Sequence, residues 1–169
     1  MITVVNATLN DLPVIKELAY KIWPVAYEAI LSDKQLDYML RSFYSEATLK
    51  DNVHNKGHHF LLVKDENECI GFAAYENNYQ GQLVTRIHKL YLLPTTQGKG
   101  IGRQLLNHIT GIAIANAMNR LSLNVNRLNI ALAFYQRLGF QIIREENIEL
   151  DHGYLMEDYV MEKDLVLAR

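Results

Sequence analysis

The segment from Leu90 to Arg103 restricts the fold of this chain more than any other stretch of its sequence. It reads Leu-Tyr-Leu-Leu-Pro-Thr-Thr-Gln-Gly-Lys-Gly-Ile-Gly-Arg, which predicts a strand, a proline stop, a tight turn and the start of a helix. The first turn of a helix carries unpaired N–H groups and the positive end of the helix dipole. Glycines let the backbone approach an anion closely, and Lys99 and Arg103 add positive charge nearby. The amides from Gly98 to Arg103 are therefore predicted to form a cradle for a pyrophosphate.

Two common phosphate-binding loops do not fit these letters. A Walker loop ends in Gly-Lys-Ser or Gly-Lys-Thr, whereas Lys99 is followed by Gly100. A dinucleotide fingerprint requires the pattern Gly-x-Gly-x-x-Gly, and the glycines at positions 98, 100 and 102 lack its final spacing. The predicted cradle therefore belongs to neither class.

The remaining sequence predicts a mixed α/β fold. The hydrophobic period changes along the chain from helical spacing to strand alternation and back, which favours a mixed sheet with helices on both faces. No internal repeat, low-complexity tract or linker divides the sequence, so we expect residues 1–169 to form a single domain. The expected elements, in chain order, are a strand at 2–7, a helix at 11–23, a helix that opens at the capping box Ser32-Asp33-Lys34-Gln35, a helix at 45–55, strands at 59–64, 69–76 and 83–93, a helix at 100–117, a strand at 121–125, a helix at 130–138, and strands at 140–146 and 154–163.

Charge and composition exclude several classes of protein. The formal net charge of -2 gives no basic surface for nucleic acid. The uncharged apolar stretches are far shorter than the ~20 residues of a membrane helix, and the first residues lack the basic and apolar regions of a secretory signal. Cys69 is the only cysteine and has no partner for an intramolecular disulfide. We expect a cytoplasmic protein that binds neither nucleic acid nor a membrane.

A second motif covers residues 126–140, which read Asn-Arg-Leu-Asn-Ile-Ala-Leu-Ala-Phe-Tyr-Gln-Arg-Leu-Gly-Phe. Together with Gln97-Gly98-Lys99-Gly100-Ile101-Gly102, which matches the acyl-CoA signature Q/R-x-x-G-x-G/A, it resembles the GNAT superfamily of acyl-CoA N-acyltransferases. The second motif is similar to the closing helix of that superfamily, although Asn129 lies one residue closer to Tyr135 than in the commonest spacing. The resemblance is tight over residues 87–140 and looser elsewhere, and it extends to bacterial acetyltransferases of small amines and polyamines.

The resemblance implies a GNAT fold, with a mostly antiparallel central sheet in α-β-α layers, and a site for acetyl-CoA as co-substrate. Members of the superfamily bind acetyl-CoA in a V-shaped gap between two central parallel strands, which here correspond to residues 83–93 and 121–125. The gap frees backbone groups for the pantetheine arm, and the N–H of Leu92 is the expected donor to the thioester carbonyl. The residues expected to contact acetyl-CoA are Leu90, Tyr91, Leu92, Gln97, Gly98, Lys99, Gly100, Ile101, Gly102, Arg103 and Asn129.

Two residues are expected to transfer protons. Tyr135 matches the family tyrosine that protonates the departing CoA thiolate, and the alternative is an aromatic side chain that only packs on its helix. The acceptor amine must attack as the free base, yet an amine with a pKa of ~10.4 is mostly protonated at neutral pH. His88 is the candidate base because it titrates in a suitable range, and strand alternation puts it on the same face as Leu90. The alternative is a histidine hydrogen-bonded within the sheet, with a water chain in place of the base.

The acceptor is expected to meet Trp23, Tyr27 and Glu28, which lie in the region that shapes the acceptor pocket in this family. Aromatic rings and a carboxylate can hold a cationic amine, whereas ordinary core and surface positions are the alternative. No metal site is predicted, because His58 and His59 point to opposite faces of an extended strand. The other histidines lack a recognised ligand spacing with Asp, Glu or Cys.

The sequence therefore predicts an N-acetyltransferase that moves an acetyl group from acetyl-CoA to a primary amine, on a small molecule, by direct transfer in a ternary complex. A protein N-terminal or lysine acetyltransferase is one alternative, and a non-catalytic acyl-CoA-binding sensor is another. The presence of Tyr135 argues against the sensor, which would keep the glycine-rich loop and lose the acid, and the undamaged motif from Gln97 to Gly102 argues against a module that has lost CoA binding. Nothing in the sequence selects the acceptor, and a homodimer stays open because dimers are frequent in this family.

Overall fold

The computed structural model describes residues 1–166, and the chain divides into two compact units. The N-terminal unit consists of Met1–Glu76 and His88–Ile109. The C-terminal unit consists of Asn77–Ile87 and the chain from Thr110 onward. Strand β4 (Val84–Leu92) begins in the C-terminal unit and ends in the N-terminal unit. Helix α4 (Ile101–Ala115) begins in the N-terminal unit and ends in the C-terminal unit.

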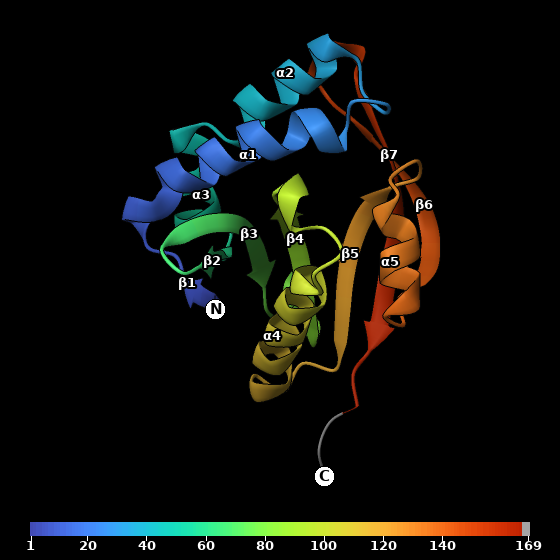
Figure 1. Ribbon diagram of the computed structural model, residues 1–169. Helices are drawn as coiled ribbons and strands as arrows, with labels where there is room; N and C mark the ends of the chain where they lie inside the picture. The colour runs from blue at the N-terminus through green and yellow to red at the C-terminus, as the bar shows by residue number, and fades with distance from the viewer. Residues whose placement is uncertain (167–169) are drawn as a thin grey trace. The chain divides into compact units, whose positions relative to one another are not determined.

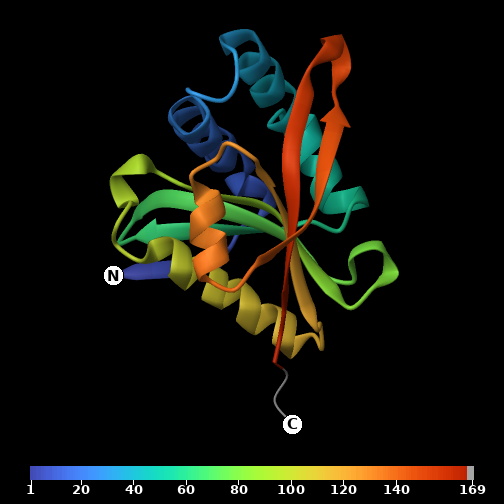
Figure 2. The same cartoon turned by 90° about the vertical axis from the view of Figure 1, so that its right-hand side faces the viewer.

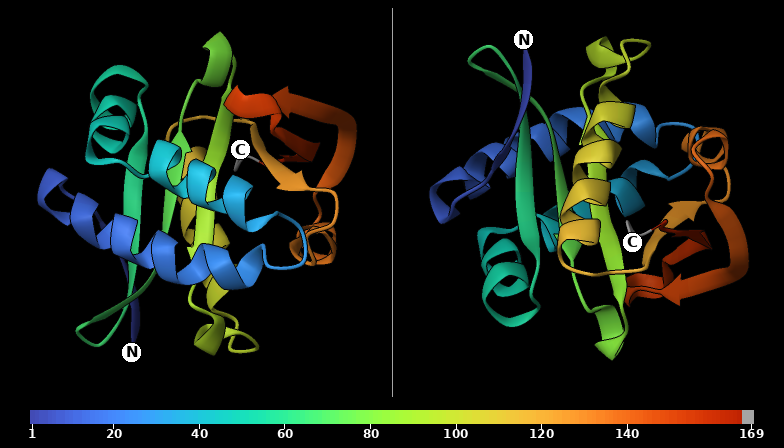
Figure 3. Two further views of the ribbon diagram at one scale, coloured as in Figure 1. Left: turned by 90° about the horizontal axis from the view of Figure 1, so that it is seen from above. Right: turned by 90° about the horizontal axis from the view of Figure 1, so that it is seen from below.

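The N-terminal unit is built from three strands, three helices, the end of β4 and the start of α4. Strand β2 pairs antiparallel with both β1 and β3, with a register shift between Val63 and Lys64. Helices α1 and α2 cross the front of the strands in one view of Figure 3, and α4 crosses the front in the opposite view. Helices therefore cover both faces of the sheet in this unit, as predicted. The elements are β1 (Ile2–Asn6), α1 (Leu12–Ala26), α2 (Asp33–Phe43), α3 (Glu46–Asn55), β2 (His59–Asp65) and β3 (Glu68–Glu76).

Figure 1 shows helices α1, α2 and α3 of this unit. Local sequence signals account for them. Ser32 Oγ accepts a hydrogen bond from the N–H of Gln35 at 3.2 Å, and Ser45 Oγ accepts one from the N–H of Thr48 at 3.1 Å. Each serine thereby satisfies one of the unpaired amides at the start of its helix. One face of α1 is buried in the core, and its apolar residues, which recur at helical spacing, are at most 4% exposed: Leu12, Ile15, Leu18, Ala19 and Ile22.

The C-terminal unit contains the rest of the sheet. The start of β4 pairs parallel with β5 (Arg120–Asn126) from Val84↔Arg120 to Ile87↔Leu123. Helix α5 (Ala131–Arg137) follows, and β6 (Gln141–Glu149) then pairs antiparallel with β7 (Leu155–Asp164), which also pairs antiparallel with β5. Figure 2 shows β6 and β7 side by side as a long hairpin.

Within residues 1–166, hydrogen-bonded strands follow the order β1-β2-β3-β4-β5-β7-β6 in a seven-stranded sheet. The pairings between β1 and β2, β2 and β3, β5 and β7, and β6 and β7 are antiparallel, so the predicted mixed, mostly antiparallel sheet is confirmed. The predicted elements are all present, with ends displaced by a few residues at most. None of the helices in the described part of the chain combines the length and apolar character required to cross a membrane.

Candidate functional site

The turn after β4 is held by Thr96. Leu93 O accepts two hydrogen bonds from this residue, one from its N–H at 2.9 Å and one from its Oγ1 at 2.7 Å. Thr96 is buried, so the short 3-10 turn Pro94–Thr96 anchors the end of the strand in the core. The chain then becomes exposed from Gln97 to Gly100, and α4 begins at the next residue. The predicted sequence of strand, proline, turn and helix is therefore present.

The glycine-rich turn offers open backbone amides. Gly98 and Gly100 adopt the left-handed conformation, with φ of 78° and 74°, which glycine tolerates without strain. A Cβ placed on either residue would meet no atom within 4 Å. The N–H of Gln104 donates to Gly100 O at 3.1 Å, whereas the three amides before it have no such partner within the helix. The first turn of α4 carries no acidic residue, so its positive polarity is suited to a pyrophosphate.

The end of β4 directs an N–H group away from β3. The N–H of Leu93 donates to Ile70 O on β3 at 2.9 Å. Because successive N–H groups of a strand point to opposite edges, the N–H of Leu92 points to the edge away from β3. The register of β4 with β5 ends at Ile87, before Leu92 is reached. Leu92 therefore has the orientation that a donor to a thioester carbonyl requires.

Close packing at this point depends on Gly71 of β3. A Cβ on Gly71 would collide with the Leu92 side chain and would lie 2.7 Å from Tyr91 O. Real Cβ atoms do not approach a carbonyl oxygen so closely without displacement of the backbone. Gly71 therefore allows β3 to support the strand segment that is expected to face acetyl-CoA.

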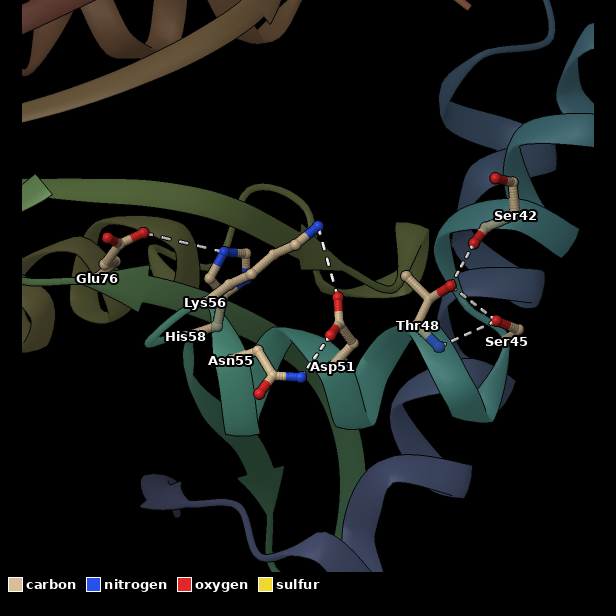
Figure 4. A network of polar contacts seen from close by, with 8 residues as sticks. All are labelled: Ser42, Ser45, Thr48, Asp51, Asn55, Lys56, His58 and Glu76. Carbon is tan, nitrogen blue, oxygen red and sulfur yellow. Dashed lines mark hydrogen bonds and ion pairs between the residues drawn. The ribbon is translucent and has the colours of Figure 1, made fainter. Parts of the chain in front are cut away.

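The predicted base, His88, lies beside a carboxylate and a second histidine. His88 Nε2 is 2.9 Å from Glu76 Oε1, and His58 Nε2 is 4.0 Å from the same oxygen. The rings of His58 and His88 are stacked, with centroids 3.8 Å apart and planes inclined by 14°. Figure 4 shows the His58 ring facing Glu76. The side chains of His58, Glu76 and His88 are 9%, 23% and 19% exposed, so the cluster is largely shielded from water.

Burial controls the charge of this cluster. It is the main cause that lowers the pKa of His58 to about 3, and positive charge on His88, Lys89 and Lys56 lowers it further. His58 is therefore neutral at physiological pH. Burial also lowers the pKa of Lys89 to about 8, with a smaller effect of Lys56. The Lys89 ammonium lies 5.7 Å from the ring centroids of both Tyr44 and Phe60, which is the range of a cation–π contact.

The stacked rings argue against a metal ion shared by the three side chains. The nearest ligand atoms of His58, Glu76 and His88 lie within 4.8 Å of one another. An imidazole nitrogen donates its lone pair in the plane of its ring, and the planes of two stacked rings, inclined by 14° with centroids 3.8 Å apart, do not converge at bonding distance. The arrangement fits a hydrogen bond between His88 and Glu76 instead.

The residues predicted to meet the acceptor lie around the end of α1. The helix runs past its predicted end, and the N–H of Tyr27 donates to Trp23 O at 2.9 Å. The Trp23 side chain is 3% exposed, and its ring centroid lies 4.8 Å from that of Tyr27 and 5.5 Å from that of Tyr91. Tyr27 is half-buried, Glu28 is exposed, and the hydroxyl oxygens of Tyr27 and Tyr91 are 3.0 Å apart. The structure therefore brings Tyr27 against β4, with Trp23 packed behind it in the core.

Asn129 and Tyr135 belong to the C-terminal unit. Asn129 Oδ1 accepts a hydrogen bond from the N–H of Ala131 at 2.9 Å, so this side chain caps the start of α5. Tyr135 is 7% exposed, and its ring contacts those of Phe134 and Phe140. The other predicted site residues lie in the N-terminal unit: Trp23, Tyr27, Glu28, His88, Leu90, Tyr91, Leu92, Gln97, Gly98, Lys99, Gly100, Ile101, Gly102 and Arg103.

Sequence reasoning did not identify Glu76, His58 or Lys89. Glu76 ends β3, and His88 lies in β4, the strand that follows it. A prediction of the register between these two strands could have placed the two side chains together. His58 precedes β2, and no sequence pattern relates its ring to that of His88.

Comparison with known proteins agrees with this geometry. Residues 16–140 match the acetyltransferase (GNAT) family. The chain is 26% identical over 161 residues to the spermidine N(1)-acetyltransferase of Thermoplasma acidophilum, with 92% of each chain covered. It is 27% identical over 116 residues to the peptidyl-lysine N-acetyltransferase YjaB of Salmonella typhimurium, with 68% of this chain and 65% of that protein covered.

A solved structure shows the same fold. The crystal structure of the PaiA N-acetyltransferase from Thermoplasma acidophilum in complex with coenzyme A has a TM-score of 0.80 and 25% sequence identity to this chain. The similarity covers 98% of this chain and 99% of that one. The family match spans the glycine-rich turn, strand β4 and helix α5. The chain therefore belongs to the GNAT acetyltransferase family, whose members are enzymes that use acetyl-CoA as the acetyl donor.

Proposed function

We propose that this enzyme acetylates the primary amine of a small cationic molecule, by direct transfer from acetyl-CoA in a ternary complex. The observation that carries the proposal is the hydrogen bond between the hydroxyls of Tyr27 and Tyr91, whose oxygens are 3.0 Å apart. It joins the end of α1, where an acceptor is expected, to the strand that is expected to face the acetyl group. Aromatic rings next to the exposed carboxylate of Glu28 suit a cationic amine.

The glycine-rich turn is proposed to hold the pyrophosphate of acetyl-CoA. Amides from Gly98 to Arg103 would donate to the phosphate oxygens, while the Lys99 and Arg103 side chains neutralise part of the charge. The open space above Gly98 and Gly100 supports this role. The other residues proposed to contact acetyl-CoA are Gln97, Ile101, Asn129 and, through their backbone, Leu90, Tyr91 and Leu92.

His88 and Tyr135 are proposed to move the two protons of the reaction. His88 accepts a proton from the acceptor ammonium, so that the amine nitrogen can form a bond to the acetyl carbon. The N–H of Leu92 stabilises the negative charge that develops on the carbonyl oxygen. When the carbon–sulfur bond breaks, the Tyr135 hydroxyl gives its proton to the departing thiolate. The nitrogen of the addition intermediate then loses its second proton, which restores the Tyr135 hydroxyl by way of solvent. The products are the N-acetylated amine, CoA thiol and one proton that His88 releases to solvent, so atoms and protons balance.

Both compact units are proposed to act as one catalytic domain over residues 1–169. The family match at residues 16–140 draws on both units, and the similarity to PaiA extends over 98% of the chain. We also propose a cytoplasmic location, because the single cysteine has no internal disulfide partner. A homodimer is compatible with the proposal, which does not require one.

Peptidyl-lysine is the second candidate acceptor. The similarity to YjaB favours it, although that match covers less of this chain than the match to the spermidine enzyme. A lysine side chain and a polyamine present the same primary ammonium group, so the proton transfers proposed for His88 and Tyr135 serve either acceptor.

The test measures release of CoA thiol from acetyl-CoA by the purified full chain, with spermidine, glucosamine, free amino acids and lysine peptides as acceptors. The proposal expects turnover with spermidine or another small amine, and intersecting initial-velocity lines that indicate a ternary complex. Glu28→Gln should raise the KM for that amine and leave the KM for acetyl-CoA unchanged. Glu17→Gln, the same change at another exposed glutamate, on α1, serves as the matched control. Turnover confined to peptides would move the enzyme to the second candidate class.

A further inference from the structure

Glu76 is the residue outside the predicted site that the geometry ties most directly to the reaction. Its Oε1 lies 2.9 Å from His88 Nε2, and both side chains are largely shielded from water. A carboxylate at this distance from an imidazole limits which ring nitrogen carries the proton. We propose that Glu76 is a positioning residue that holds the proton of neutral His88 on Nε2. Nδ1 of His88 is then the atom that receives the proton from the acceptor. This proposal rests on the proposed role of His88 as the base.

The assignment follows from hydrogen-bond chemistry. An ionised carboxylate can only accept hydrogen bonds, so the Nε2 that contacts Glu76 must carry the hydrogen. In a neutral imidazole the other nitrogen then carries the lone pair, which places the basic site of His88 on Nδ1. After Nδ1 takes up a proton, the ring is positively charged, and the adjacent carboxylate stabilises that charge. Glu76 therefore orients the ring before proton transfer and stabilises it afterwards.

His58 packs against this pair as a neutral ring. It stacks on His88 with ring centroids 3.8 Å apart, which restricts rotation of the His88 ring. Its Nε2 is 4.0 Å from Glu76 Oε1, beyond hydrogen-bond distance, and its Nδ1 is buried with no hydrogen-bond partner. Burial holds the pKa of His58 near 3, so a second imidazolium does not compete for the carboxylate at neutral pH.

Several other charged groups surround the two histidines. Lys89 follows His88 on β4, Lys56 lies at the end of α3, and His59 begins β2, and all three act on His58 through their charge. Lys56 also forms an ion pair with Asp51, as Figure 4 shows. Nearby positive charges disfavour protonation of an imidazole, whereas a carboxylate in contact with it, as Glu76 is with His88, favours protonation. Glu76 is therefore the group whose removal should change the proton affinity of His88 most.

The first measurement needs no substrate. The full chain is labelled with ¹⁵N at histidine, and His88 is assigned by comparison with His88→Gln. We expect the neutral ring of His88 to carry hydrogen on Nε2 in the wild type, and to lose this preference in Glu76→Gln, whose amide can both donate and accept. Glu68→Gln makes the same change at the exposed start of β3 and should leave the His88 signals unchanged. Hydrogen on Nδ1 of His88 in the wild type would overturn the proposal.

The second measurement is the pH profile of kcat/KM with spermidine as acceptor. Loss of the carboxylate lowers the pKa of His88, so the acidic limb in Glu76→Gln should move down by about one pH unit. The plateau should fall by up to about 10-fold, because the weaker base receives a proton less readily. A purely structural role would reduce activity without moving the limb, and an unmoved limb in an active Glu76→Gln enzyme refutes the proposal. If the wild type acetylates no amine, the proposed function is refuted. The tautomer measurement then still decides whether Glu76 holds the hydrogen of His88 on Nε2.

Discussion

Replacing Gly71 with alanine probes how tightly β3 packs against the end of β4. The new Cβ would collide with the Leu92 side chain, and it would lie 2.7 Å from Tyr91 O and 3.2 Å from Leu92 Cα. Two of these three atoms belong to the backbone, so rotation of a side chain cannot relieve the contact. The β3–β4 pair must therefore shift.

Two opposing effects determine how far Gly71→Ala changes the free energy of unfolding. Overpacking of a filled site costs about 1–3 kcal/mol. Loss of the glycine reduces the entropy of the unfolded chain, which returns about 0.4–1 kcal/mol. We therefore expect Gly71→Ala to lower the free energy of unfolding by about 1–2 kcal/mol, and to lower Tm by about 4 °C for a chain of this size.

Urea unfolding followed by circular dichroism measures this difference, and Gly111→Ala is the matched control. Gly111 lies within α4, and a Cβ there would meet no atom within 4 Å. The same substitution should stabilise the protein by about 0.5–1 kcal/mol, because alanine favours a helix. The two variants thus have opposite expected signs. A Gly71→Ala protein as stable as the wild type would show that β3 does not restrain Tyr91 and Leu92, and would remove the packing argument.

Three further predictions concern the cradle, the acid and a buried charge. Gly100→Glu should abolish acetyl-CoA binding in calorimetry, because it adds a negative charge to the turn, whereas Gly81→Glu, at the same φ of 74° and with no atom within 4 Å, should bind normally. Tyr135→Phe should lower kcat about 100-fold with an unchanged Kd for acetyl-CoA, and equal turnover at a chemistry-limited rate would exclude Tyr135 as the acid. Lys89→Met should raise Tm at pH 7, because burial of the charged ammonium destabilises the folded wild type at that pH. Burial lowers the pKa of Lys89 to about 8 in the folded state, against ~10.4 in the unfolded chain, so the unfolded chain binds more protons between pH 8 and ~10.4. The wild type gains stability as pH rises through this window, so the advantage of Lys89→Met should shrink by pH 10, and a pH-independent difference would contradict the reasoning.

Features governed by neighbours in sequence were predictable. The buried face of α1 follows from helical spacing, and the starts of α2 and α3 follow from Ser32 and Ser45, whose side chains cap amides three residues away. The turn at Gly98 and Gly100 follows from the need for a left-handed backbone. Each of these signals involves residues less than two helical turns apart, so the local sequence is enough to predict the feature.

Contacts between distant segments required the tertiary structure. Nothing in the sequence near Glu76 indicates that it contacts His88 at 2.9 Å, or that His58 stacks on the same ring. The hydroxyl contact between Tyr27 and Tyr91 likewise depends on where α1 crosses β4. Trp23 was predicted beside the acceptor, but the structure turns its side chain into the core.

The physical reason for this division is the range of the forces involved. Hydrophobic period, capping and glycine conformation express the preferences of a few adjacent residues, and they determined the elements, the turn and the family of this protein. The charge state of a side chain depends instead on burial and on groups brought near it by folding. The neutral His58, the weakly basic Lys89 and the pairing of Glu76 with His88 were therefore decided only when β2, β3 and β4 came together.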